Sequence, residues 1–208
     1  MVDAVNLTPE VDVVNLIGKA AAMESRKDAL VAAATALLDK GGPDAVTLRE
    51  VGRAAGVSHN APYKHFADKE ELLAAVAAAD LARQTQIVSS GPPRSLRELM
   101  QGYARAALRH PERFQLTFGR WGRDDAGLGE AALHAHENLL GAVVAAQEAA
   151  ELPKGDPERL AALVRALAHG AADLALAGHL KAGGKGKANP ADLIDDLFDY
   201  LAAAARRP

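Results

Sequence analysis

Apolar residues recur with helical spacing along most of the chain. Leu30, Ala34, Leu37 and Leu38 share one face of a helix with 3.6 residues per turn, which predicts an amphipathic helix beginning at about residue 25. Gly41-Gly42-Pro43 ends this helix, because glycine accepts the left-handed cap conformation and proline cannot continue a helix. Residues 1–23 have only a weak pattern, so we expect a loose arm or a short extra helix there.

The pattern then predicts two short helices and a long one. Thr47 with Glu50, and Asp68 with Glu71, have the spacing of capping boxes, and Gly56 lies between them at a sharp turn. Short helices are therefore expected at about 47–55 and 58–66, and a long connecting helix at about 68–88. This order is typical of a helix-turn-helix, whose second helix enters the DNA major groove.

Residue types within this segment suit such a unit. The small shared core is expected to contain Val46, Leu48, Val51 and Val57, while Ala54 and Ala55 would let the helices cross closely. A second helix over 58–66 would be roughly 13 Å long, which matches a groove about 12 Å wide.

The remainder of the chain is also predicted to be helical. Ser89 to Pro93 interrupt the pattern, and a glycine- and lysine-rich loop spans residues 181–187. Five helices are expected near 95–109, 111–122, 128–151, 156–181 and 190–206. The last two carry more apolar surface than one chain can cover, which predicts a two-fold four-helix interface between two copies. The expected interface residues are Leu167, Leu174, Leu193, Leu197 and Leu201.

Composition limits the function classes. The 208 residues include no cysteine, which excludes disulfides, zinc-thiolate sites and thiol nucleophiles. No apolar run is long enough to span a bilayer, and the acidic N-terminus does not resemble a signal peptide, so we expect a soluble cytoplasmic protein without membrane contact. The net charge of −3 gives no general attraction to nucleic acid, although residues 49–69 have a local charge of +2 from four basic and two acidic side chains.

Four stretches of the same segment carry a specific resemblance. They are Val46-Thr47-Leu48-Arg49-Glu50-Val51, Ala54-Ala55-Gly56-Val57-Ser58, Ala61-Pro62-Tyr63-Lys64-His65-Phe66 and Lys69-Glu70-Glu71-Leu72. Together they resemble the DNA-binding domain of the tetracycline-repressor (TetR-type) family over roughly residues 25–75. A weaker resemblance, in residues 169–180, is to the dimerising helix of such regulators.

The resemblance implies roles for individual residues. Thr47, Tyr63, His65 and Lys69 match the family's phosphate contacts. Positions that approach base edges or the neighbouring backbone are occupied by Arg49, Ser58, His59, Asn60, Ala61 and Lys64. Pro62 departs from the family, in which leucine is common, and proline is tolerated only in the first turn of a helix. The recognition helix is therefore expected to start later or to open irregularly, and Phe66 is expected to anchor it in the core.

Aromatic residues gather in the predicted body of the protein. Core packing explains such a group, and so does a pocket between helices. The resemblance favours a pocket for an apolar or aromatic effector, lined by Met100, Tyr103, Phe114, Phe118 and Trp121.

Enzymatic alternatives have weaker support. His134 and His136 lie two positions apart, about 200° around a helix, so they do not readily bind one metal ion. The sequence has no Gly-x-Ser-x-Gly element and no glycine-rich phosphate loop. We therefore predict no catalytic residues, metal or cofactor. A helical small-molecule-binding protein without DNA binding, and a metal-dependent enzyme, remain as alternatives.

Together these observations predict an all-α regulator of about nine helices. Residues 1–23 are assigned to the arm, 24–70 to a three-helix DNA-binding domain, and 71–208 to a ligand-binding and dimerisation domain. The expected function is that of a homodimeric transcriptional repressor that a small-molecule effector releases from a pseudo-palindromic operator.

Overall fold

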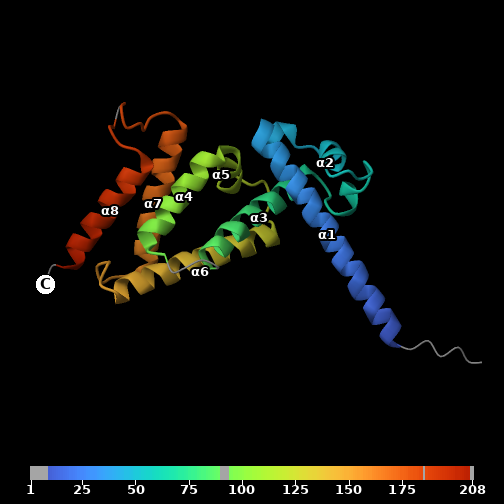
Figure 1. The fold of residues 1–208 in the computed structure, drawn as a ribbon, viewed down its shortest axis with the longest axis horizontal. Helices are drawn as coiled ribbons and strands as arrows, with labels where there is room; N and C mark the ends of the chain where they lie inside the picture. Colours follow the sequence, from blue (N-terminus) through green and yellow to red (C-terminus); the bar gives the residue numbers. More distant parts are fainter. Residues whose placement is uncertain (1–8, 90–93, 185, 207–208) are drawn as a thin grey trace, which may run out of the picture. The chain divides into compact units, whose positions relative to one another are not determined.

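The computed structural model describes residues 9–89, 94–184 and 186–206, and these residues are almost entirely helical (Figure 1). Apart from an isolated bridge between Lys181 and Gly186, they contain no strand, so the all-α prediction is confirmed. The α-helices are α1 (Pro9–Gly41), α2 (Leu48–Ala54), α3 (Lys69–Ser89), α4 (Leu96–Arg109), α5 (Pro111–Thr117), α6 (Ala126–Glu148), α7 (Pro157–Leu176) and α8 (Pro190–Ala205). Two short 3₁₀ helices, η1 (Pro43–Ala45) and η2 (Pro62–Lys64), complete the set.

The chain divides into two compact units. The first is Met1–Val76 and the second is Ala77–Pro208, so α3 contributes residues to both. Each unit has its own buried residues, and each is described by itself below.

The start of the chain differs from the prediction. Helix α1 begins at Pro9 and continues to Gly41, so the part of the expected arm from residue 9 onward belongs to the same helix as Leu30 and Leu38. The remainder of the expected arm, residues 1–8, lies outside the described residues. A loose arm was one of the two expectations for residues 1–23, because their sequence shows only a weak amphipathic pattern. The helix ends where predicted, and Gly42 has a positive φ of 67°, although its ψ of −171° differs from that of a left-handed helical cap.

In the first unit, α1 packs against η1 and α2. Leu30, Ala34 and Leu38 of α1 are buried, as their spacing predicts. Val46, Leu48 and Val51 are also buried, which confirms three of the four residues expected in the small core. The prediction for Val57 is wrong: its backbone N–H donates to the Gly52 carbonyl of α2 at 3.0 Å, but the residue is 36% exposed.

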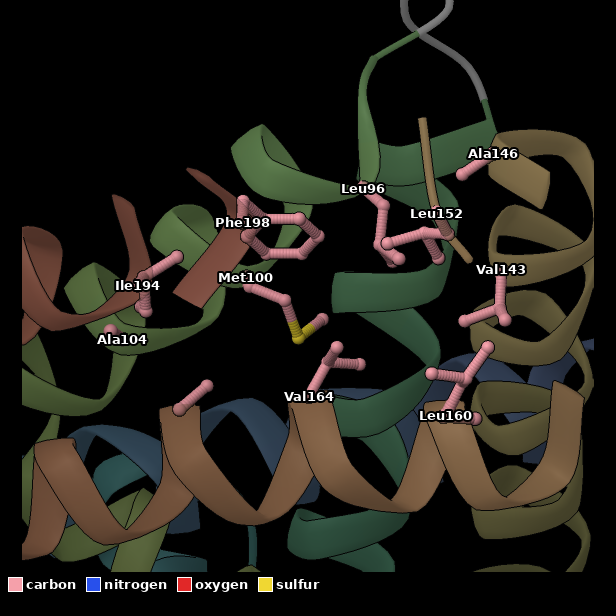
Figure 2. Packing of buried hydrophobic residues seen from close by; sticks show 12 residues of the cluster. Leu96, Met100, Ala104, Val143, Ala146, Leu152, Leu160, Val164, Ile194 and Phe198 are labelled. Carbon is pink, nitrogen blue, oxygen red and sulfur yellow. The ribbon is translucent and has the colours of Figure 1, made fainter. Parts of the chain in front are cut away.

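In the second unit, α4, α6, α7 and α8 form one core. Helix α4 packs on α7, and both contact α6 and α8. Figure 2 shows Met100 of α4, Val164 of α7 and Phe198 of α8 in this core, with Val143 of α6 alongside. Leu96, Met100, Ala104 and Ala107 recur every three or four residues and form the buried face of α4. The five helices expected after residue 93 are all present.

Side-chain caps fix the starts of the helices in this unit. Ser95 and Glu98 form a full capping box at α4, and Asn189 and Asp192 form another at α8. Asp125 and Asp156 accept backbone N–H groups at the starts of α6 and α7. Such caps satisfy amides that a helix leaves unpaired.

One helix end adopts an unfavourable backbone. Beyond α6, Ala150 has φ 56°, a conformation in which a side chain costs about 1–2 kcal/mol. The N–H groups of Glu151 and Leu152 both donate to the Ala146 carbonyl, at 2.9 and 3.2 Å, and hold the turn in place. Leu152 is thereby buried against the core of the second unit.

Within the part of the chain that the structure describes, no helix is long and apolar enough to cross a membrane.

Candidate functional site

The predicted DNA-binding segment starts at the N-terminus of α2. Thr47 has extended backbone angles, and its side chain accepts the Glu50 N–H at 3.1 Å. The Glu50 carboxylate turns outward and accepts from Arg53 at 2.9 Å, so only one half of the predicted capping box forms. Thr47 and Arg49 are both exposed at this helix end, where free N–H groups and the helix dipole favour an anion.

The turn after α2 depends on two glycines. Gly56 has φ 68°, which supplies the predicted reversal. Gly52 makes the close approach: a Cβ placed there would lie 3.1 Å from Cγ of Pro62 and 3.4 Å from the Ser58 carbonyl oxygen. The prediction had assigned this close crossing to Ala54 and Ala55, and it is wrong, since Ala54 is exposed. The buried Gly52 was the sequence signal that was missed.

The recognition element is shorter than expected. In place of a helix over 58–66, the structure has the 3₁₀ turn η2 from Pro62 to Lys64. Pro62 has no N–H to donate to the Ser58 carbonyl, so that carbonyl accepts from Ala61 at 2.9 Å instead, in a tighter turn. The irregular opening expected from Pro62 is therefore present, and the estimated helix length of 13 Å is wrong.

Buried anchors hold this turn and leave its polar residues outside. Pro62 and Phe66 are among the most fully buried side chains of the chain, which confirms Phe66 as a core residue. Between them, Tyr63 is 57% exposed and Lys64 is exposed as well. A large aromatic side chain on the outside of a buried turn is unusual for a residue that serves only packing.

All ten predicted DNA-contacting residues are accessible to some degree. The structure exposes Thr47, Arg49, Ser58, His59, Asn60, Tyr63 and Lys64, and half-buries Ala61, His65 and Lys69. Among the described residues, no carboxylate lies within ion-pairing distance of Arg49, Lys64 or Lys69, whereas Arg53 pairs with Glu50 at 2.8 Å. The unpaired cations thus give this segment a capacity to bind anions.

Lys69 opens α3 beside two capping carboxylates. Asp68 accepts the Glu71 N–H at 3.0 Å, and Glu71 accepts the Ala67 N–H at 2.7 Å. The second predicted capping box is therefore shifted, because Glu71 satisfies the residue before the cap. These carboxylates hold Lys69 at a defined helix start.

A large cavity lies in the second unit. Its volume is about 820 Å³, within the range typical of small-molecule sites. Met100, Tyr103, Phe118 and Trp121 line it, so four of the five predicted pocket residues meet there. Phe114 packs instead with Ala107 and Ala172 in a small core cluster. The arginines that also line the cavity were not predicted from the sequence, because only Met100 and aromatic residues were selected there.

An aromatic cluster adjoins this cavity, and two of its members, Tyr103 and Phe118, line it. His169 of α7 packs against both Phe114 and Phe118, with ring centroids 4.7 and 5.1 Å away, and these two rings also contact each other at 5.3 Å. The Tyr103 hydroxyl and His169 Nδ1 are hydrogen-bonded at 2.8 Å. Burial raises the pKa of the Tyr103 hydroxyl well above its usual value, and the charge of Arg165 opposes this shift only in part. Tyr103 therefore stays protonated at neutral pH.

Most of the predicted interface leucines already pack within their own chain. Leu167, Leu197 and Leu201 are half-buried against the core of the second unit, and Leu193 packs on the cluster of Ala171, Leu180 and Ala188. Leu174 is 47% exposed. The large apolar residues that α7 and α8 leave most exposed are Leu163 at 60% and Tyr200 at 73%, which the prediction did not include. Helix α7 also ends at Leu176, before the predicted residue 181.

The histidines of α6 have separate partners. His134 contacts Glu137 at 3.3 Å and Glu130 at 3.8 Å, whereas His136 contacts Glu158 of α7 at 3.1 Å. In the described ranges, no three histidine, aspartate or glutamate side chains are grouped so that they could hold a metal ion.

An exposed helix-turn-helix segment and a helical unit with a cavity together define the class of helical one-component regulators. The family profile described as bacterial regulatory proteins, tetR family, matches residues 30–76, and the profile described as tetracyclin repressor-like, C-terminal domain, matches residues 96–205. The second match alone covers more than half of the chain. The chain therefore belongs to the tetR family of bacterial regulatory proteins.

Individual relatives agree with this assignment. A protein of unknown function from Rhodococcus sp. RHA1 is 30% identical, with a TM-score of 0.70 over 86% of this chain and 94% of that chain. The HTH-type transcriptional repressor AcnR of Corynebacterium glutamicum is 38% identical over 73 residues, which span 35% of each chain. The regulator FadR of Bacillus subtilis, solved in complex with stearoyl-CoA, has a TM-score of 0.62 at 12% identity over 85% of this chain and 97% of that chain, and this likeness concerns the fold alone.

Proposed function

We propose that this protein is a transcriptional repressor that binds operator DNA through residues 47–69. The observation that carries the proposal is the η2 turn, which buries Pro62 and Phe66 while it exposes Tyr63 and Lys64. The exposed cations Arg49 and Lys64 supply the local positive charge that a protein of net charge −3 otherwise lacks.

The proposed contacts divide by chemistry. Thr47, Tyr63, His65 and Lys69 take phosphates, since each carries a donor suited to a phosphate oxygen. Arg49, Ser58, His59, Asn60, Ala61 and Lys64 approach base edges or the adjacent backbone, and they determine which sequence is bound. Because η2 is a single turn, base contacts are fewer than a full recognition helix would make.

We further infer a homodimer joined through α7 and α8. The exposed Leu163, Leu174 and Tyr200 on these helices support this interface. A two-fold axis presents two DNA-binding segments, so the operator is pseudo-palindromic. The cavity in the second unit takes a small-molecule effector. Because α3 contributes to both units, effector binding changes the DNA affinity of the first unit and releases the operator.

The decisive experiment is selection of bound sequences from random DNA, followed by binding measurements on the selected site. Tyr63→Phe and Lys69→Ala should weaken binding to every sequence, and Lys69→Ala should reduce the salt dependence by about one unit of slope. Lys154→Ala removes an exposed lysine from the second unit and is the matched control.

The outcomes separate the proposal from its main alternative. A palindrome in the selected sequences supports a dimeric repressor, and wild-type affinity and slope in both variants would refute the assigned contacts. If no sequence is enriched while effector-like molecules still bind the cavity, the protein is a small-molecule-binding protein that does not bind DNA.

A further inference from the structure

The charges that line the cavity are unbalanced. Six arginines and three carboxylates line it, although the whole chain has a net charge of −3. Two of the three carboxylates already serve as helix caps: Glu98 accepts the Ser95 N–H at 2.9 Å, and Asp125 accepts the Leu128 N–H at 2.9 Å. Positive charge therefore exceeds the negative charge available to balance it.

Of these six arginines, those on α4 and α7 have no carboxylate partner among the described residues. They are Arg105 and Arg109 of α4 and Arg165 of α7. Arg109 lies in the last turn of α4, where the helix dipole favours a cation in any case. Arg105 and Arg165 lie inside their helices, so that explanation does not apply to them.

The charges of Arg105 and Arg165 both lie near the turn of α4 that contains Gly102 and Tyr103. The Arg105 guanidinium folds over Gly102, with Nη2 3.9 Å from the place of a Cβ on that residue. Arg165 exerts its charge on the hydroxyl of Tyr103, the next residue along the helix. Gly102 and Tyr103 both line the cavity, so the two cations flank one part of its wall.

A second observation also indicates a missing acceptor. Among buried side-chain atoms of the described residues, Trp121 Nε1 and Thr117 Oγ1 have no hydrogen-bond partner. Both residues line the cavity, and Thr117 is only 9% exposed. A buried donor without an acceptor costs about 1–3 kcal/mol, which is why such groups are rare in folded proteins.

The rest of the lining is apolar. Leu99, Met100, Phe118 and Leu139 supply aliphatic and aromatic surface from α4, α6 and the segment after α5. A purely anionic molecule would leave this surface in contact with water, whereas a purely apolar molecule would leave the exposed Arg105 and Arg165 paired with water alone. The cavity therefore matches a molecule that combines both properties.

We propose that the effector is an anionic amphiphile, with an apolar body on the aromatic wall and a carboxylate or phosphate head bound by Arg105 and Arg165. Guanidinium groups bind both kinds of head through paired, charge-assisted hydrogen bonds. This inference rests on the proposed effector cavity and specifies the chemical class that the cavity takes.

Molecules with one body and different heads test the proposal on the wild-type protein. The probes are 6-phenylhexanoate, 6-phenylhexyl phosphate, 6-phenyl-1-hexanol and 6-phenylhexylamine, followed by fluorescence of Trp121, the single tryptophan, and by calorimetry. At least one anion should bind about tenfold or more tightly than the alcohol, a factor that corresponds to 1.4 kcal/mol. The amine should bind most weakly, and salt should weaken the anions alone.

Variants identify the residues that bind the head. Arg105→Gln and Arg165→Gln should each weaken the anion about tenfold and leave affinity for the alcohol unchanged, so the alcohol also reports that the cavity is intact. Arg159→Gln, which removes an exposed arginine of α7 outside the cavity, should change neither affinity.

The outcomes test the anionic class of the effector separately from the existence of an effector cavity. If the alcohol binds as tightly as both anions, or the amine binds best, the anionic class is refuted while the effector cavity stands. If none of the four molecules binds, the cavity is not an effector site and both inferences fail. Because the wild-type comparison decides between these outcomes, the proposal remains testable even if a variant does not fold.

Discussion

Leu163→Asp should dissociate the proposed homodimer. Leu163 lies on α7 and is 60% exposed in the single chain, so its side chain gains apolar burial only if another chain covers it. Leu197 and Leu201 are less suitable targets than the sequence suggested, because both also pack on their own core and a charge there would disturb the fold.

The magnitude follows from the exposed fraction. Complete burial of a leucine side chain contributes about 1.5–3 kcal/mol, so covering the exposed 60% of Leu163 contributes roughly 1–2 kcal/mol. A two-fold interface uses each residue twice, which doubles the loss to about 2–4 kcal/mol per dimer. The dimer dissociation constant should therefore rise by about 30- to 1000-fold. Two unpaired buried carboxylates would increase this further.

Sedimentation velocity over a concentration series measures the effect, and circular dichroism checks that the variant is folded. Leu133→Asp is the matched control, since Leu133 is a leucine of α6 that is 55% exposed. An α7–α8 interface would be refuted if Leu163→Asp kept the wild-type dissociation constant, or if Leu133→Asp dissociated the dimer equally.

Three further predictions concern the fold around the sites. Gly52→Val should abolish DNA binding, because even the Cβ would lie 3.1 Å from Pro62 Cγ and the larger side chain must separate α2 from η2. Ligand binding in the second unit should persist. If the variant kept its DNA affinity, the close approach of α2 and η2 would be dispensable. Ala150→Gly should raise the free energy of unfolding by up to about 1 kcal/mol, since glycine accepts φ 56° without strain. A lower free energy of unfolding than wild type, measured by urea denaturation, would contradict this reason. Hydrogen bonds from the Ser95 backbone and side chain lower the pKa of Glu98 from 4.5. Wild type should therefore be more stable than Glu98→Gln above pH 4.5, and this advantage should be lost as pH falls through the lowered pKa. Urea midpoints across this range would test it, and an advantage that did not change with pH would rule out the charge of Glu98 as its source.

Pattern alone determined much of the fold. Apolar spacing identified the buried faces of α1 and α4, since burial along a helix follows its 3.6-residue period directly. Gly56 and Pro62 predicted the turn and the irregular recognition element, because both act on the local backbone whatever surrounds them. These signals are local, so they are readable without the tertiary structure.

Tertiary packing decided the remaining features. Gly52 matters because Pro62, ten residues later, lies against it, and no local pattern records that contact. Leu197 and Leu201 remain predicted interface residues, but the folded chain also packs them, half-buried, against its own core, whereas Leu163 stays exposed. Arg105 and Arg165 are sixty residues apart and resemble ordinary helix-surface cations in the sequence. They line one cavity because α4 packs on α7, and two of the three carboxylates of that cavity are used as helix caps. The balance of charge around a cavity depends on which helices meet there, and only the folded chain determines that.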